Sequence, residues 1–278
     1  MSVFAHLSDL HFGREIPSVS EALIRQLKRI KPELIIISGD LTQRARQAQY
    51  IKAQEFLREL PAPYLVIPGN HDLVAINLLE RFTFPWKKWR RYVGVDLEPE
   101  IQTAGAAIKG VNTVRRLGAG FDWSRGSISE TQVNSISQAM SKAPSDRLRL
   151  VVSHHPFWMP ELYAHRNLIE GGRRALPYMK EAGVDLILSG HIHVAFAHVL
   201  DGVIISHAGT AVSSRLRRGH PNSFNLLSGN TEELTITLMQ WHVDDFQEAG
   251  KQTFGKHNGS WDYADEHVEQ HRQTGSIR

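Results

Sequence analysis

The sequence predicts an α/β sandwich, in which strands alternate with helices along most of the chain. Short apolar runs recur, and each ends on polar or glycine-rich residues. Helix-like stretches lie between these runs. Near-continuous apolar runs are typical of strands that are buried on both faces. The repetition of strand, polar loop and helix therefore predicts buried sheets with helices packed against them.

The predicted strands are the apolar runs that precede the segments SDLH, SGD, PGNHD, SHHP, SGHIH and SHAGT. They span residues 3–7, 34–37, 64–67, 148–152, 186–188 and 203–205. The predicted helices span residues 19–30, 45–60, 130–143 and 172–182, the last of them interrupted by Pro177.

The C-terminal part of the chain has a different pattern. Residues 223–227 and 234–241 predict two strands that a Gly229-Asn230 turn joins, which favours an antiparallel continuation of a sheet. After about Phe246 the chain becomes polar, and residues 269–278, EQHRQTGSIR, are typical of a loose tail. We therefore assign residues 1–246 to one domain and residues 247–278 to a polar, partly disordered C-terminal extension.

Composition excludes several classes of protein. The 278 residues are 41% hydrophobic, enough for a substantial core, and the net charge of +3 is too small for wholesale binding of nucleic acid. The chain has no cysteine, so any metal ion must be held by nitrogen and oxygen atoms. The first apolar run begins almost at Met1, and no stretch is long and uncharged enough to span a bilayer. We expect a soluble, cytoplasmic protein.

Polar clusters follow the predicted strands, where open α/β sheets gather their functional groups. Taken singly, the aspartates could be helix caps and His154 and His155 could be surface residues. In GHIH, however, alternate residues of an extended segment point to one side, so that His191 and His193 can face one centre while Ile192 packs inward. The segment DLH repeats this spacing with Asp9 and His11.

These two spacings, together with Asp40, Asn70 and His154, supply more ligands than one zinc ion takes. They suit two ions that share a carboxylate.

The motifs DLH, GD, GNHD, HHP and GHIH occur in this order, and through them the chain resembles the calcineurin-like metallophosphoesterase family over roughly residues 1–215. The pattern is most similar to those of class III cyclic-nucleotide phosphodiesterases and glycerophosphodiesterases. The resemblance implies a four-layer α/β/β/α sandwich of two mixed sheets flanked by helices, with a dinuclear metal site at the sheet edges. It assigns one metal ion to Asp9, His11 and His193, the other to Asn70, His154 and His191, and the bridging position to Asp40.

The expected cofactors are two divalent or mixed-valence metal ions, which could be Fe, Mn or Zn. Two such ions can bind a phosphoryl oxygen and share a water that becomes the attacking hydroxide. His71 follows the ligand Asn70 and is the candidate general acid for the leaving alkoxide, with Asp72 orienting it. The side chain of His155 is expected to point away from the metals, and His207 is a candidate lining residue.

The expected function is therefore hydrolysis of a small-molecule phosphate ester, with a phosphodiester as the first hypothesis. Alternatives are a phosphomonoesterase or protein phosphatase, a lipid-linked pyrophosphate hydrolase, and a non-catalytic scaffold of the same fold. Scaffolds usually have eroded ligand sets, whereas this set is intact. A nuclease is the weaker hypothesis, because no extended Lys/Arg groove or DNA-capping domain is evident.

An insertion of aromatic and basic residues follows GNHD. It spans residues 77–94, NLLERFTFPWKKWRRYVG. A helix beginning near Pro85 would place Trp86 and Trp89 on one face and Lys87, Arg90 and Arg91 on another. Three interpretations stay open: a structural cap over the core, a basic lip that recognises phosphate, and a peripheral membrane contact.

Overall fold

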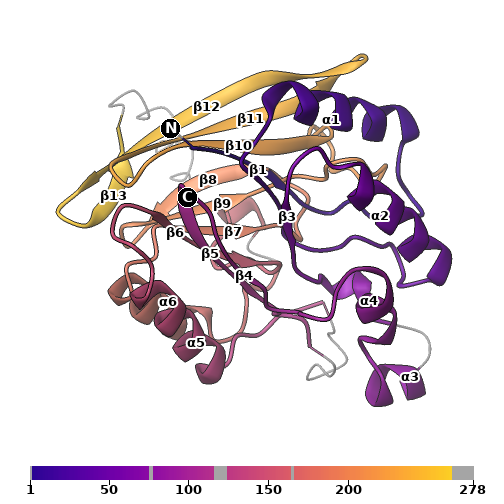
Figure 1. Ribbon diagram of the computed structural model, residues 1–278, viewed down its shortest axis with the longest axis horizontal. Coiled ribbons are helices and arrows are strands. Elements are labelled where there is room, and N and C mark those ends of the chain that lie inside the picture. Colours follow the sequence, from indigo (N-terminus) through magenta and orange to yellow (C-terminus); the bar gives the residue numbers. More distant parts are fainter. Residues whose placement is uncertain (1, 75–77, 116–123, 164–165, 265–278) are drawn as a thin grey trace.

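The computed structural model describes residues 2–74, 78–115, 124–163 and 166–264 (Figure 1). In these parts of the chain, two mixed β-sheets stack face to face and helices cover their outer faces. This arrangement confirms the predicted four-layer α/β/β/α sandwich.

The first sheet has seven strands in the order β13-β12-β11-β10-β1-β2-β3. Its strands are β1 (Ser2–Leu7), β2 (Leu34–Ile37), β3 (Tyr64–Val66), β10 (Ser223–Gly229), β11 (Glu233–His242), β12 (Asp245–His257) and β13 (Ser260–Tyr263). The second sheet has six strands in the order β4-β5-β6-β7-β9-β8. Its strands are β4 (Glu100–Gln102), β5 (Ala106–Val111), β6 (Leu148–Ser153), β7 (Leu186–Ser189), β8 (Phe196–Leu200) and β9 (Val203–His207).

The helices lie in the outer layers or follow the strand ends. They are α1 (Pro17–Ile30), α2 (Gln47–Glu59), α3 (Leu78–Thr83), α4 (Lys87–Tyr92), α5 (Glu130–Ser141) and α6 (Gly172–Glu181), with short 3-10 helices η1 (Asn70–Asp72) and η3 (Glu161–Tyr163). Pro177 lies within α6 without ending it. Among the described residues, no helix is long and apolar enough to cross a membrane.

Strand β2 shows why its sequence, Leu-Ile-Ile-Ile, is apolar throughout. Leu34 and Ile36 face the second sheet, whereas Ile35 and Ile37 face α1 and α2. Successive side chains of a strand point to opposite faces, so a strand between two apolar layers needs apolar residues at every position. The uniformly apolar sequence of β2 thus matches its burial on both faces.

The direction of the strands brings the polar motifs together. Strands β1, β2 and β3 pair in parallel, and so do β5, β6, β7 and β9. The carboxyl ends of parallel neighbours lie at the same edge of a sheet, and the polar segments DLH, GD, GNHD, HHP and GHIH follow β1, β2, β3, β6 and β7. These edges of the two sheets meet at the candidate site.

The first sheet continues beyond the domain boundary that we assigned at residue 246. Strand β12 pairs along its length with β11, and β13 pairs with β12. Phe246 and Phe254 are the buried residues of β12 and the others are exposed or partly exposed, so its sequence has the polar composition of an extension. Residues 269–278, predicted as a loose tail, lie outside the described residues.

The part of the 77–94 insertion that carries Trp86 and Trp89 packs on the first sheet's helical layer. Trp86 and Trp89 are buried in the core cluster that contains Tyr50 of α2 and the outer face of the sheet. Lys87, Arg90 and Arg91 are exposed. The structural-cap interpretation accounts for both tryptophans, because neither is available at the surface. The lip interpretation concerns the exposed cations and stays a prediction.

Candidate metal centre

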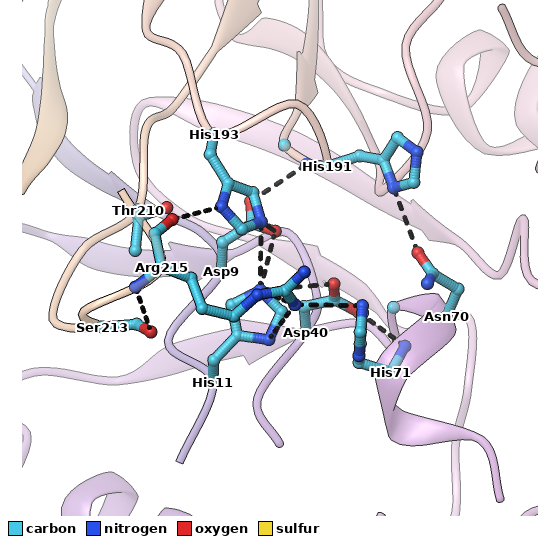
Figure 2. A network of polar contacts seen from close by, with 12 residues as sticks. Asp9, His11, Asp40, Asn70, His71, His191, His193, Thr210, Ser213 and Arg215 are labelled. Carbon is cyan, nitrogen blue, oxygen red and sulfur yellow. Dashed lines mark hydrogen bonds and ion pairs between the residues drawn. The ribbon is translucent and has the colours of Figure 1, made fainter. Parts of the chain in front are cut away.

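The structure brings together the predicted carboxylates, amide and imidazoles at the shared strand edge (Figure 2). They come from the loops that follow β1, β2, β3, β6 and β7, and all but Asn70 are almost fully buried. The residues are Asp9, His11, Asp40, Asn70, His154, His191 and His193.

Sharp turns, rather than extended chain, aim these side chains. Asp9, Asp40 and His191 have positive φ angles of 54°, 53° and 76°, and His11 and His193 share this conformation. A non-glycine residue in the left-handed region costs about 1–3 kcal/mol and is found chiefly at functional sites. A tight turn, and not strand alternation, aims the two histidines of GHIH, and it directs them to different groups: His193 lies beside Asp9 and His191 beside Asn70.

The first predicted ligand set contains two imidazoles and one carboxylate. His11 Nε2 lies 3.1 Å from His193 Nε2 and 3.5 Å from Asp9 Oδ1. His193 Nε2 lies 3.2 Å from the same carboxylate oxygen. The Nδ1 atom of His193 donates a hydrogen bond of 2.7 Å to the carbonyl oxygen of Arg215. That bond leaves the Nε2 lone pair directed at the centre.

The second predicted set contains two imidazoles and one amide. Asn70 Oδ1 lies 3.2 Å from His154 Nε2 and 3.0 Å from His191 Nδ1. The Nδ1 atom of His154 donates to the carbonyl oxygen of Ser38 at 2.8 Å. A backbone carbonyl therefore fixes the ring of His154 as another fixes the ring of His193.

Asp40 lies between the two sets. Its Oδ2 atom is 3.6 Å from His11 Nε2 and 3.4 Å from His154 Nε2. Its Oδ1 atom accepts a hydrogen bond of 2.8 Å from the backbone amide of His71. One carboxylate is thus held by the η1 turn and faces a histidine of each set.

The donor set fits bound cations. Asp9 Oδ1 is buried and accepts no hydrogen bond from the described residues, although two imidazole nitrogens lie near it. At His154, burial opposes the charged ring, but the Asp40 carboxylate outweighs it and raises the pKa to about 9. The centre therefore attracts positive charge, and a metal ion supplies that charge to several of these atoms at once.

Glycines leave room for the ligands. A Cβ atom on Gly69 would lie 2.1 Å from Asp40 Oδ1, and one on Gly190 would lie 2.6 Å from Asp9 Oδ2. At Gly39 a Cβ atom would lie 2.7 Å from His154 Nδ1. Each of these contacts is closer than a Cβ atom tolerates. The glycines of GD, GNHD and GHIH are thus part of the ligand geometry.

His71 lies beside His11, and its ring is held by a backbone carbonyl and not by Asp72 as we expected. Its Nδ1 atom donates to the carbonyl oxygen of Gln43 at 2.8 Å. The carboxylate of Asp72 instead accepts hydrogen bonds from the backbone amides of Leu41, Thr42 and Gly69. The η1 turn sends the two neighbouring side chains in different directions. Asp72 therefore joins two loops and does not orient the ring of His71.

Asp72 is fully enclosed by these loops. Burial and the nearby Asp40 carboxylate raise the pKa of Asp72 to about 7, although the three backbone amides oppose this shift. Its bonds connect the loop that carries Asp40 to the turn that carries Asn70. Asp72 thus ties together the two loops that carry these candidate ligands.

Arg215 is a site residue that the sequence analysis did not identify. Its Nη1 atom lies 3.1 Å from His71 Nε2 and 3.3 Å from His11 Nε2 (Figure 2). The residue belongs to the loop after β9, beyond the segment SHAGT. A basic run, Arg215-Leu216-Arg217-Arg218, in the polar segment after the predicted strand 203–205 was the available signal.

Two further histidines lie behind the centre. His155 is buried beside the second set rather than pointing away from it, with its ring centroid 4.8 Å from that of His191. Its Nδ1 atom meets Thr113 Oγ1 at 2.7 Å, and burial lowers its pKa to about 3. His207 is also buried, hydrogen-bonds the carbonyl oxygen of Gly190 and stacks on Phe196. It supports the GHIH turn from behind.

Comparisons with known proteins agree with this geometry. A family model described as calcineurin-like phosphoesterase matches residues 2–195. A probable glycerophosphodiester phosphodiesterase, GpdQ, of Arcobacter nitrofigilis is 24% identical over 245 residues, which cover 85% of this chain and 83% of GpdQ. The 3',5'-cyclic adenosine monophosphate phosphodiesterase CpdA of Escherichia coli K12 is 24% identical over 189 residues, 60% of this chain and 58% of CpdA.

The fold has a relative among solved structures. Purple acid phosphatase PPD1 from yellow lupin seeds superposes with a TM-score of 0.68 at 12% identity, over 92% of this chain and 54% of that chain, which shows a likeness of fold alone. The family model, in contrast, covers most of this chain and includes the segments that supply the candidate ligands. The chain therefore belongs to the calcineurin-like phosphoesterase family.

Proposed function

We propose that this chain is a metal-dependent phosphodiesterase acting on a small molecule. Asp9, His11 and His193 would hold one metal ion, Asn70, His154 and His191 a second, and Asp40 would contact both. The observation that carries this proposal is the position of Asp40 Oδ2 between His11 Nε2, at 3.6 Å, and His154 Nε2, at 3.4 Å. Two bound ions would neutralise phosphoryl oxygens and activate a water for attack on phosphorus.

The ligand types favour first-row transition metals. Imidazole and carboxylate together suit Fe, Mn and Zn, so we propose two ions drawn from these, divalent or of mixed valence. The hydrogen bonds that hold these rings support this donor set, because His154 and His193 each give their Nδ1 proton to a backbone carbonyl. Both rings can then offer Nε2 to a cation.

The relatives support a phosphodiester as the substrate class. GpdQ is named as a glycerophosphodiester phosphodiesterase and CpdA as a cyclic adenosine monophosphate phosphodiesterase. Hydrolysis of a phosphodiester breaks one P–O ester bond and yields an alcohol and a phosphate monoester. We propose this reaction class for the chain.

His71 is the proposed proton donor. The hydrogen bond from Nδ1 to the Gln43 carbonyl fixes the ring, and Nε2 faces His11 and Arg215 at the centre. A proton on Nε2 would pass to the leaving alkoxide as the ester bond breaks. Asp72, which we expected to be catalytic, is proposed instead as a positioning residue for Asp40 and Asn70.

A paired assay tests the proposed function. Protein reconstituted separately with Mn²⁺, Zn²⁺ or Fe²⁺ is assayed with bis(4-nitrophenyl) phosphate and with 4-nitrophenyl phosphate. We expect metal-dependent hydrolysis of both, with the higher kcat/KM for the diester. A higher kcat/KM for the monoester would reverse the assignment in favour of a phosphomonoesterase. Hydrolysis of neither compound, by protein that contains metal, would favour a non-catalytic scaffold.

A further inference from the structure

Arg215 is a cation placed at the candidate centre without an acidic partner. No carboxylate among the described residues lies within ion-pair distance of its guanidinium group, and the guanidinium contacts the rings of His11 and His71 through Nη1. A guanidinium group has five N–H donors and no acceptor. Most of the donors of Arg215 are therefore free to bind an added anion.

Two other arginines, Arg81 and Arg115, are used differently. Arg81 is buried and donates Nη1 and Nη2 to the carbonyl oxygens of Val74 and Arg115. Arg115 in turn forms an ion pair with Glu170. These side chains hold the protein's own loops, whereas the guanidinium of Arg215 faces the imidazole rings of His11 and His71.

The backbone of Arg215 is fixed in position. Its carbonyl oxygen accepts the Nδ1–H bond of His193, and its amide donates to Ser213 Oγ at 3.1 Å. The neighbouring Ser214 donates through both its amide and its hydroxyl to the carbonyl oxygen of Arg14, at 2.8 Å and 3.0 Å. The loop is thus tied to the segment that follows His11. The backbone from which the guanidinium extends is therefore fixed beside the centre, and only the side chain has to be ordered when an anion binds.

We propose that Arg215 binds a non-bridging oxygen of the substrate's phosphoryl group. This inference rests on the proposed function, since it names the group that would contact the phosphate from the side of His71 and His11. The planar fork of a guanidinium matches two oxygens of a phosphate, and hydrogen bonds between charged partners are the strong ones. The contact to His71 Nε2 holds the guanidinium in place until an anion takes those donors.

The inference distinguishes Arg215 from its neighbours in sequence. Arg217 and Arg218 are exposed, and Arg217 donates Nε to the carbonyl oxygen of Ile192. Only Arg215, within this basic run, contacts candidate site residues. Arg218 therefore offers a matched control, since it has the same charge in the same loop.

The test measures binding of inorganic phosphate to protein loaded with Mn²⁺. Isothermal titration calorimetry is performed on the wild type, Arg215→Gln, Arg215→Lys and Arg218→Gln, with the Mn²⁺ content of each sample measured in parallel. We expect Arg215→Gln to weaken phosphate binding by about 10- to 100-fold, the range for hydrogen bonds to charged groups, with unchanged Mn²⁺ content. Arg215→Lys should restore part of this loss, because it keeps the charge but not the fork. Arg218→Gln should bind phosphate as the wild type does.

Kinetics supply a second measurement. If the contact is made equally in the ground state and the transition state, Arg215→Gln raises KM for bis(4-nitrophenyl) phosphate and leaves kcat nearly unchanged, whereas a contact that strengthens in the transition state lowers kcat as well. Either result supports the inference when phosphate binding is weakened too. Phosphate binding by Arg215→Gln equal to that of the wild type would overturn it, and so would loss of Mn²⁺ from this variant. If the wild type binds phosphate but hydrolyses no ester, the proposed reaction fails while the phosphate titration still decides the role of Arg215.

Discussion

The two halves of the candidate centre are alike in their imidazoles and differ in their third ligand. Each half has two histidines and shares Asp40, but Asp9 gives the first half a carboxylate where Asn70 gives the second an amide. The first half therefore carries one more negative charge. A cation is held more tightly by a charged oxygen ligand than by a neutral one. We therefore expect the first half to bind its ion more tightly than the second.

Protonation separates the halves further. Burial lowers the pKa of His11 in the first half, even though Asp9 and Asp40 oppose the shift. In the second half the pKa of His154 is raised to about 9 by Asp40, against the effect of burial. An ion that enters the second half must displace a proton near neutral pH, and this competition adds to the charge difference.

Removing the shared carboxylate is expected to have the largest effect. Asp40→Ala should prevent stable binding of both ions and lower activity by roughly 10⁴-fold or more, because both halves lose a charged ligand. Metal content by mass spectrometry of purified protein checks the result. The exposed Asp146 supplies a control, since Asp146→Ala should leave both ions in place. Two tightly bound ions in Asp40→Ala would show that the halves are independent.

His71→Ala should separate chemistry from metal binding. We expect both ions to be retained and kcat to fall by about 10²- to 10⁴-fold for esters with alkyl leaving groups, which need a proton. The loss should be much smaller for bis(4-nitrophenyl) phosphate, because nitrophenolate leaves without protonation. Equal losses for the two kinds of ester, measured side by side, would argue against proton donation by His71.

The pH dependence of metal binding should come from one half. With the pKa of His154 near 9, the affinity for one ion should fall by roughly tenfold for each unit that the pH is lowered from about 8.5 to 7. The other ion should depend less on pH in this range, because burial already favours the neutral ring of His11. Mn²⁺ titrations at several pH values measure both slopes. Equal slopes for the two ions would remove protonation as a difference between the halves.

Two glycines allow each half to be disturbed separately, with the smallest expected effects. Gly190→Ala would crowd Asp9 of the first half, and Gly39→Ala would crowd His154 of the second, where a φ of +106° adds strain. Overpacking of this kind costs about 1–3 kcal/mol in the free energy of unfolding. Gly94→Ala is the control, because its Cβ would meet nothing within 4 Å. Thermal unfolding and metal content measure the effects, and a Gly39→Ala variant as stable as Gly94→Ala would contradict the packing argument.

Much of this architecture could be predicted from sequence because burial on both faces leaves a clear pattern. The runs before DLH, GD, GNHD, HHP and GHIH became strands, and the expected metal ligands gather where those strands end. Strands β12 and β13 were not predicted, because β12 has a run of exposed residues in its middle and its sequence is largely polar. Strand β12 forms by pairing with β11, and its own amino-acid composition does not predict that pairing.

The parts of the site that were missed depend on contacts distant in sequence. Arg215 meets His11 across 204 residues, and no spacing between them predicts the contact. The neighbouring letters of His71 and Asp72 suggested a hydrogen-bonded pair, yet the η1 turn directs Asp72 toward Leu41 and Thr42. The contact of Arg215 depends on how distant segments pack, and the direction of Asp72 depends on backbone conformation. Neither can be read from neighbouring residues in the sequence.

The most direct test of unequal halves joined by Asp40 is a metal titration of the wild type and Asn70→Ala at one fixed pH. We expect the metal-free wild type to bind two Mn²⁺ ions per chain in two steps, and Asn70→Ala to lose the weaker step while it keeps the tighter one. Calorimetry gives both affinities, and native mass spectrometry counts the ions. A single ion per wild-type chain, or loss of the tighter step in Asn70→Ala, would contradict the account.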